Sequence, residues 1–364
     1  MIDEGAHVSK GLVAVVVFSV FMASWASAQA ADFSELVRTG SAQQVQVAIA
    51  QGADIKALDA NRQNSLHIAA QYNKDPAVIS VLAKAGADPN VIDVNGSTPL
   101  GLALENAQTP PDVVTALLQA GAAVNVTDNN GYTPLILALG NKYPADVIME
   151  IVKAGADMKP AKTDTPLVSA LANRYPADVI SAFLQAGASA TDPNPNGMTP
   201  LTAALMNDGP PDVVTALLRA GASAGARTHD GLSSLMLAAA DNHNPQVISL
   251  LVNAGVDINA RDPQGMTALM YAVTWGALMG QVPEVIVALV KAGADVNIMD
   301  AGGDTVLMYA ASSPSAEMLV ATLLAAGADA KVRDKTGKIA LDYAKANAKL
   351  INTDAYRQLE KASQ

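Results

Sequence analysis

The sequence predicts an all-α protein, a solenoid of about ten stacked helix pairs joined by hairpin-like fingers. Two columns of residues recur in step along the chain, at intervals of 32 to 38 residues. Half of the residues are hydrophobic but only 4% are aromatic, which suits close packing of short helices. Apolar residues also recur at helical spacing within each interval. A unit of this length cannot bury its apolar face alone, so it must stack on its neighbours.

The two columns are a leucine in a T-x-L pattern and a glycine later in each unit. The leucines are Leu66, Leu100, Leu135, Leu167, Leu201, Leu235, Leu269, Leu307 and Leu341. The glycines are Gly52, Gly86, Gly121, Gly155, Gly187, Gly221, Gly255, Gly293 and Gly327. Two independent columns that keep step indicate one structural unit repeated nine times.

Residues 1–30 differ from the rest and are predicted to be a secretory signal peptide. Residues 11–31 carry no charge, and an apolar core is followed by small residues up to Ala30. An apolar core before an A-x-A site is typical of a cleaved signal, so we expect cleavage after Ala28 or Ala30. The alternative is an uncleaved N-terminal membrane anchor, because the stretch is just long enough to span a bilayer.

The first helix of each repeated unit is predicted from its opening residues. A hydroxyl side chain can cap a helix, and proline suits the first helical position because its missing N–H has no intrahelical partner there. These pairs are Thr98-Pro99, Thr133-Pro134, Thr165-Pro166 and Thr199-Pro200. The helix is expected to end at an asparagine that tolerates left-handed backbone, at Asn106, Asn141, Asn173 or Asn207.

The second helix of each unit is predicted to begin at a proline and to end at the column glycine. Acidic residues follow most of these prolines and basic residues lie near several helix ends, as the helix dipole favours. The prolines are Pro76, Pro111, Pro144, Pro176, Pro211, Pro245 and Pro283. Turn-forming residues such as Asp93-Val94-Asn95-Gly96 come next and predict a projecting finger.

Taken together, these motifs resemble the ankyrin-repeat proteins. The resemblance is carried by Thr133-Pro134-Leu135, by Ala154-Gly155-Ala156-Asp157, and by the turn from Asp93 to Leu100. It implies an ankyrin-repeat solenoid with a helical pair or partial repeat at 31–57, the array at 58–340 and capping helices at 341–364.

Three departures from the family pattern carry expectations of their own. The histidine that follows T-P-L in the family is present only as His67, which puts a hydrogen bond at the base of the other fingers in doubt. The linker from Gly155 to Thr165 is short and lacks the Asp-x-x-Gly turn, so its finger should be blunted. The seventh unit is longer, and its extra residues at 275–281 predict a protruding loop.

The candidate binding residues lie just before the residue that caps each first helix. The resemblance implies that this position faces the concave groove and contacts partners. Tyr132, Met198, Leu232 and Met266 would then form an apolar stripe, interrupted at Asp164. The alternative is that these side chains only pack against neighbouring fingers. Trp275, on the longer loop, is a second candidate, with local packing as its alternative.

The sequence gives little support for catalysis, metal binding or nucleic-acid binding, so no catalytic, cofactor-binding or metal-binding residue is predicted. The chain has no cysteine, and its formal charge of -11 disfavours nucleic-acid binding. Ser223 lies in a G-x-S-x-G string, but that string coincides with the column glycine that ends a helix. Asp192-x-Asn194-x-Asn196 resembles the start of a calcium loop, but Ala203 replaces the glutamate needed at position twelve.

The predicted function is a non-enzymatic protein–protein interaction module exported to the bacterial periplasm. We expect a monomer that binds an unidentified protein through its concave face, with no cofactor, nucleic acid or small-molecule substrate. Membrane contact is expected only through the signal peptide. The alternatives are a secreted effector that binds a host protein, a hydrolase using Ser223 and a calcium-binding protein. Asp3 and Glu4 fit a positively charged leader poorly, so translation from Val8 is a further possibility.

Overall fold

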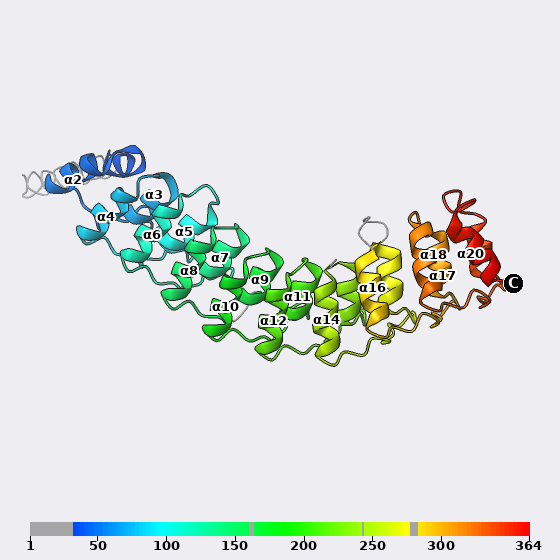
Figure 1. Ribbon diagram of the computed structural model, residues 1–364. Coiled ribbons are helices and arrows are strands. Elements are labelled where there is room, and N and C mark those ends of the chain that lie inside the picture. The colour runs from blue at the N-terminus through cyan, green and yellow to red at the C-terminus, as the bar shows by residue number, and fades with distance from the viewer. Residues whose placement is uncertain (1–31, 160–163, 242–243, 277–282) are drawn as a thin grey trace, which may run out of the picture. The chain divides into compact units, whose positions relative to one another are not determined.

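The computed structural model describes residues 32–159, 164–241, 244–276 and 283–364 (Figure 1). The predicted signal peptide lies outside these residues, as do the tip of the blunted finger and most of the longer seventh loop. The chain divides after residue 162 into two compact units, unit 1 and unit 2. Within the described residues the helices form ten pairs, four in unit 1 and six in unit 2, as the repeat pattern predicts.

Unit 1 holds a first helix over residues 32–39 and seven more helices. These are α2 (Ala42–Ala50), α3 (Ser65–Tyr72), α4 (Pro76–Lys84), α5 (Pro99–Glu105), α6 (Pro111–Gln119), α7 (Pro134–Gly140) and α8 (Ala145–Lys153).

Unit 2 has the same alternation of first and second helices. Its first helices are α9 (Pro166–Ala172), α11 (Pro200–Met206), α13 (Ser234–Ala240), α15 (Ala268–Tyr271) with the π-helix η1 (Ala272–Gly276), α17 (Val306–Ser312) and α19 (Ala340–Ala344). Its second helices are α10 (Ala177–Gln185), α12 (Pro211–Arg219), α14 (Pro245–Asn253), α16 (Pro283–Lys291), α18 (Ala316–Ala325) and α20 (Asp354–Ala362).

Like helices stack on like helices within each unit. First helices pack on first helices, as α3 does on α5, and second helices pack on second helices, as α4 does on α6. The core lies between the two layers, where Val113, Val114 and Leu117 of α6 are completely buried. Burial of such side chains supplies the main stabilisation, because each is worth about 1.5–3 kcal/mol relative to exposure.

The predicted helix starts are confirmed at the threonine caps. The Thr98 hydroxyl accepts the backbone N–H of Gly101 at 3.1 Å, and Thr133 does the same for Ile136 at 3.3 Å. Pro99 and Pro134 then occupy the first helical position. In these repeats, the capping threonine therefore sets where the first helix begins.

The ends of the first helices differ from the sequence expectation. Asn141 ends α7 but has a φ of -88°, and the left-handed residue is the next one, Lys142, with a φ of 56°. The Asn141 side-chain amide instead donates to the Leu104 carbonyl of the preceding repeat at 2.7 Å. In α9, by contrast, Asn173 donates back to Ser169 of its own helix. The asparagine therefore supplies a hydrogen bond at the helix end, while its neighbour makes the turn.

The column glycines end the second helices as predicted. Gly121 has a φ of 86°, and its N–H donates to the Leu118 carbonyl while Ala122 donates to Leu117. This pair of bonds is the Schellman arrangement that closes a helix through a left-handed residue.

The fingers connect one repeat to the next, and neighbouring fingers are joined by backbone hydrogen bonds. The Val94 N–H donates to the Asn61 carbonyl at 3.0 Å, and the Asn129 N–H donates to Asn95 at 2.9 Å. Over the described residues the structure has no β-strand, only isolated bridges between single residues. Among the described helices, none combines the length and apolarity needed to cross a bilayer.

Candidate functional site: the finger surfaces

Most of the described fingers are built around one polar side chain that accepts two backbone N–H groups. In the finger after α12, the Thr228 hydroxyl accepts one, from Leu232, at 3.1 Å. In the third finger (residues 122–133), the Asp128 carboxylate accepts the N–H of Asn130 at 2.9 Å and of Tyr132 at 2.8 Å. Asn194 makes the same two bonds in its finger, to Asn196 and Met198. An amide oxygen can therefore replace the carboxylate here.

Tyr132 is the predicted binding residue that lies in unit 1, and 42% of it is exposed. Its backbone is held at the finger base, because its carbonyl also accepts the Asp128 N–H at 3.1 Å. The phenol is thus presented on a fixed scaffold. A large, half-exposed aromatic side chain of this kind is typical of a protein contact surface.

A hollow of about 380 Å³ lies beside Tyr132, and we call it the finger hollow. Ser97, Glu105, Asp128, Asn129, Asn130 and Tyr132 are among the residues that line it. The Ser97 hydroxyl donates to the Glu105 carboxylate at 3.0 Å. Partial burial raises the pKa of Glu105, the Ser97 hydrogen bond opposes this, and the charges of Asp128 and Asp93 raise it further. The finger hollow is therefore a polar, negatively charged cavity with an aromatic wall.

The predicted residues of unit 2 differ in exposure. Met198 and Leu232 are half-buried, and Met266 is only 9% exposed. Met266 therefore offers little surface to a partner, contrary to an evenly exposed stripe. Asp164, which interrupts the pattern, accepts the Thr165 N–H and the Ser169 hydroxyl.

Trp275 lies in the π-helix η1 and not in a loop, which corrects the sequence expectation. Its ring stacks on Tyr271 with centroids 4.9 Å apart, and 48% of Trp275 is exposed. The Tyr271 hydroxyl is in turn bound to the Asp262 carboxylate at 2.8 Å. The extra residues of the seventh unit thus begin by prolonging a helix, and Trp275 both packs locally and faces solvent.

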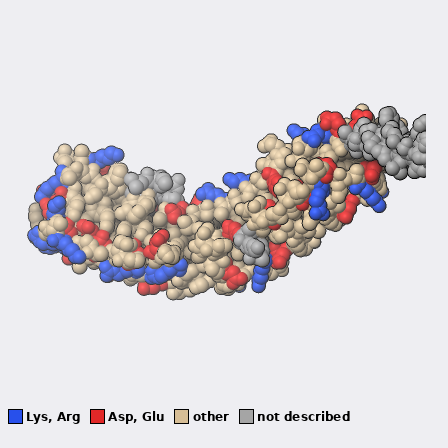
Figure 2. Space-filling model, turned by 180° about the vertical axis from the view of Figure 1, so that it is seen from behind, with Lys and Arg blue, Asp and Glu red and all other residues tan. Residues whose placement is uncertain are grey.

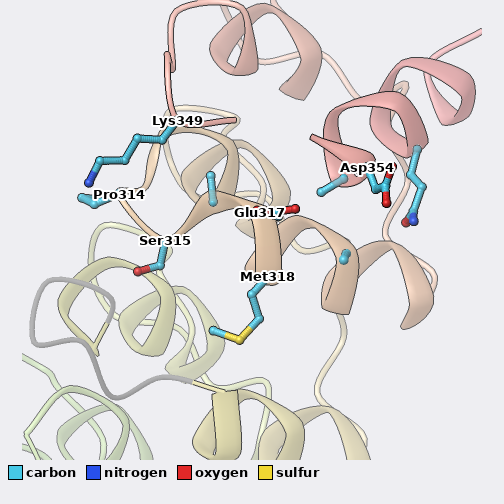
Figure 3. A pocket seen from close by; sticks show the side chains of 10 residues that line it. Pro314, Ser315, Glu317, Met318, Lys349 and Asp354 are labelled. Atoms are coloured by element: carbon cyan, nitrogen blue, oxygen red, sulfur yellow. The ribbon is translucent and has the colours of Figure 1, made fainter. Parts of the chain in front are cut away.

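A second hollow, of about 480 Å³, lies between α18 and α20 (Figure 3). Lys349, Glu317, Asp354 and the 43% exposed Met318 line it. Glu317 and Asp354 lie in the first turns of α18 and α20, where helix dipoles favour acidic residues. Helix stabilisation therefore accounts for the two carboxylates of this hollow.

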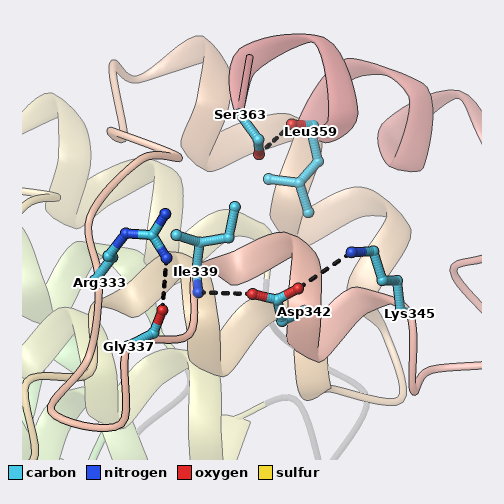
Figure 4. Close-up of polar contacts among 7 residues, drawn as sticks. All are labelled: Arg333, Gly337, Ile339, Asp342, Lys345, Leu359 and Ser363. Atoms are coloured by element: carbon cyan, nitrogen blue, oxygen red, sulfur yellow. Dashed lines mark hydrogen bonds and ion pairs between the residues drawn. The ribbon is translucent and has the colours of Figure 1, made fainter.

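The last finger is basic, unlike most of the chain. Lys331, Arg333, Lys335 and Lys338 are all exposed, and Lys and Arg gather over the C-terminal end of unit 2, at the left of Figure 2. The Arg333 guanidinium donates to the Gly337 carbonyl of the same finger (Figure 4). Nearby, the Asp342 carboxylate accepts the Ile339 N–H and so caps the start of α19. The same carboxylate pairs with Lys345 at 3.1 Å.

The hydrolase-like string and the calcium-like string both lie in turns between helices. Ser223 is exposed in the turn after α12, and its carbonyl accepts the Ala226 N–H. Asn194 of the calcium-like motif is 7% exposed, and its amide oxygen is occupied by the finger bonds. Within the described residues there is no group of three His, Cys, Asp or Glu side chains placed to hold a metal ion.

Sequence reasoning missed several apolar residues on the fingers of unit 1. Leu58, Ile92 and Val94 are 50%, 43% and 51% exposed. Leu58 and Ile92 both stand immediately before a finger aspartate and are 34 residues apart. Reading that column of the repeat, besides the column of Tyr132, would have identified them.

Comparison with protein families matches most of the chain. A family described as ankyrin repeats (3 copies) matches residues 33–128, 66–159 and 204–300. A second, described as ankyrin repeats (many copies), matches residues 289–344. Ankyrin repeats indicate a protein–protein interaction module, and proteins built from them are typically non-enzymatic scaffolds. Because these matches cover well over half of the sequence and coincide with the stacked helix pairs and fingers, the chain belongs to the ankyrin-repeat family.

Proposed function

We propose that this protein is a non-enzymatic binding module of the bacterial periplasm that holds a protein partner on its fingers and first helices. The observation that carries the proposal is the set of exposed apolar side chains on the fingers, Leu58, Ile92, Val94 and Tyr132. Apolar residues of this size on a surface with polar borders are typical of interaction sites. The stacked helix pairs within each unit offer an extended surface and little enclosed volume, which suits protein recognition better than catalysis.

Affinity capture from an envelope extract tests the proposal. The bait is the chain from residue 31 onward, beside a variant with Tyr132, Met198 and Leu232 changed to Ser. Met266 stays unchanged, because it is buried and its loss would destabilise the array. We expect one protein to be captured by the unchanged bait and lost by the variant.

A matched control separates the finger surface from general stickiness. Val47 on α2 and Met318 on α18 are 50% and 43% exposed, but lie on second helices. Changing both to Ser should leave capture intact. Equal loss of capture in this control, or retention in the finger variant, would contradict binding through the fingers.

Export to the periplasm rests on residues 1–30, whose apolar core and A-x-A site fit a cleaved signal. Cell fractionation with mass spectrometry of the mature N-terminus tests it. We expect periplasmic protein that begins at Gln29 or Ala31. Protein found mainly in the culture medium would favour the secreted effector, and protein retained in the membrane with residues 1–30 intact would favour an anchor.

A further inference from the structure

We infer that the fingers of unit 1 bind a partner segment in which a lysine or arginine side chain is flanked by apolar residues. The basic side chain enters the finger hollow, and the apolar ones lie on Ile92, Val94 and Tyr132. This inference rests on the proposed function, and adds the chemistry of the partner and the place where it binds.

The apolar half of the site consists of exposed side chains on two consecutive fingers. Ile92 and Val94 lie on the second finger (residues 88–98) and Tyr132 on the third, with exposed fractions between 42% and 51%. The two fingers are joined directly, because the Asn129 amide donates to the Val94 carbonyl at 3.2 Å. Apolar contacts at this place would therefore meet a fixed surface, with little ordering cost on binding.

The charged half of the site is the finger hollow. Among the described residues, no Lys or Arg nitrogen lies within 4 Å of the Glu105 or Asp128 carboxylate. Glu105 and Asp128 both line the hollow, so their negative charges repel. Partial burial first, and the charge of Asp128 after it, raise the pKa of Glu105. A cation from the partner would relieve this repulsion.

Tyr132 gives the same hollow an aromatic wall. A cation placed over the face of a tyrosine ring is attracted by its quadrupole. The amide oxygens of Asn129 and Asn130 can accept further hydrogen bonds from a guanidinium or ammonium group. Carboxylates, amide oxygens and an aromatic ring together favour a basic side chain over an acidic or neutral one.

The finger can lose its charge without losing its shape, which makes the inference testable. Asp128→Asn should keep both finger hydrogen bonds, because Asn194 makes the same two bonds in its own finger. Glu105→Gln keeps an oxygen that can accept the Ser97 hydroxyl. The double variant therefore removes two charges from the hollow and keeps the backbone hydrogen bonds of its finger. It loses the exposed bond from the Asn130 side-chain amide to Asp128, which is 3.3 Å long.

The probe is the tripeptide acetyl-Val-Arg-Leu-amide, compared with the same peptide carrying citrulline in place of arginine. Citrulline has nearly the same shape and no charge. Binding is followed by chemical shifts of the Asn129 and Asn130 side-chain amides in the 15N-labelled chain from residue 31 onward. We expect the arginine peptide to shift these signals and to bind roughly fivefold more tightly than the citrulline peptide.

In the E105Q/D128N variant, the arginine peptide should bind no better than the citrulline peptide. A control variant, Asp230→Asn, removes an exposed carboxylate from a finger of unit 2 and should leave binding unchanged. Equal binding of the two peptides to the unchanged chain would overturn the inference. So would an absence of shifts at Asn129 and Asn130, or full retention of binding in E105Q/D128N.

The outcome separates this inference from the proposed function. If an envelope protein is captured through the fingers and its capture is unaffected by E105Q/D128N, the binding module stands and the basic anchor is wrong. If the arginine peptide binds as expected but no envelope protein is captured, the finger hollow stands and the periplasmic partner is wrong.

Discussion

His67 shows how a single side chain closes a finger in this protein. It is completely buried, accepts the Asn64 N–H at Nδ1 and donates from Nε2 to the Ser97 carbonyl at 3.1 Å. Other units lack this histidine, yet the first of these bonds survives. The Met236 sulfur accepts the Ser233 N–H, and the Met308 sulfur accepts that of Thr305. In these two repeats, methionine thus replaces histidine as the acceptor at the base of the finger.

His67 should make stability depend on pH. Burial lowers its pKa, while the Ser97 carbonyl and the charges of Asp93 and Asp59 oppose the shift. The unfolded chain therefore takes up a proton at higher pH than the folded one. Stability from neutral His67 is full above about pH 6.5 and declines as the pH falls below it.

His67→Met is the matched variant, because methionine already serves this position in α13 and α17. Urea unfolding of both proteins at several pH values between 5 and 8 checks the expectation. The free energy of unfolding of the unchanged chain should fall more steeply below pH 6.5 than that of the variant. Parallel curves for the two proteins would contradict the role given to His67.

Two glycines with the same backbone conformation should respond differently to alanine. Gly96 and Gly121 both have positive φ, so either change costs about 1–2 kcal/mol in backbone strain. A Cβ at Gly96 would lie 2.7 Å from the Asn129 Oδ1 and 3.0 Å from its N, whereas one at Gly121 meets no atom within 4 Å. Gly96→Ala should therefore destabilise the protein more, as measured by thermal unfolding. An equal loss would mean that the fingers are not in close contact.

At the scale of the element, the finger is organised by one acceptor. Asp93 is 3% exposed, and its carboxylate accepts the N–H of Asn95 at 2.8 Å and of Ser97 at 2.9 Å. In the last three fingers, the equivalent aspartate also accepts the hydroxyl of a tyrosine from the following helix, as Asp300 does from Tyr309. The finger is therefore a closed turn and not a loose loop.

Replacement of Asp93 tests this description of the finger. Asp93→Ala leaves the N–H groups of Asn95 and of the buried Ser97 without this acceptor and should cost about 1–3 kcal/mol. Asp93→Asn should cost much less, because Asn194 supports the same turn. Chemical denaturation of both variants measures the difference. If alanine and asparagine destabilise the chain equally, charge and not hydrogen bonding holds the finger.

At the scale of the whole molecule, contacts within each unit are made between neighbouring repeats. In unit 2, α11 packs on α9 and α13, and α12 packs on α10 and α14. Stability in such arrays is close to a sum of repeat and nearest-neighbour terms. Removal of one repeat in register therefore lets its two neighbours meet across equivalent surfaces.

Deletion of residues 197–230 should leave a folded, shorter protein. The deletion removes α11 and α12 and joins Asn196 to Gly231, so that the finger turn keeps its left-handed glycine. Circular dichroism should show an unchanged helical spectrum per residue. The denaturant dependence of unfolding should fall by about a tenth, because it scales with the surface exposed. Global unfolding of the shortened chain would show that stability is not shared between neighbours.

The sequence by itself determined the repeat, the starts of the first helices and the glycine ends of the second helices. Those features depend on local chemistry: a threonine cap, a proline that lacks an N–H, and a glycine at positive φ act within one helical turn. The resemblance to the ankyrin-repeat proteins implied that Tyr132 faces a partner, and 42% of it is exposed.

Only the tertiary structure decided what depends on neighbouring repeats. It buried Met266 and turned Asn141 toward the preceding repeat. It also brought Glu105 and Asp128, which belong to different repeats, to the lining of one hollow. Exposure and charge proximity are set by residues more than twenty positions away, so a periodic pattern alone does not contain them.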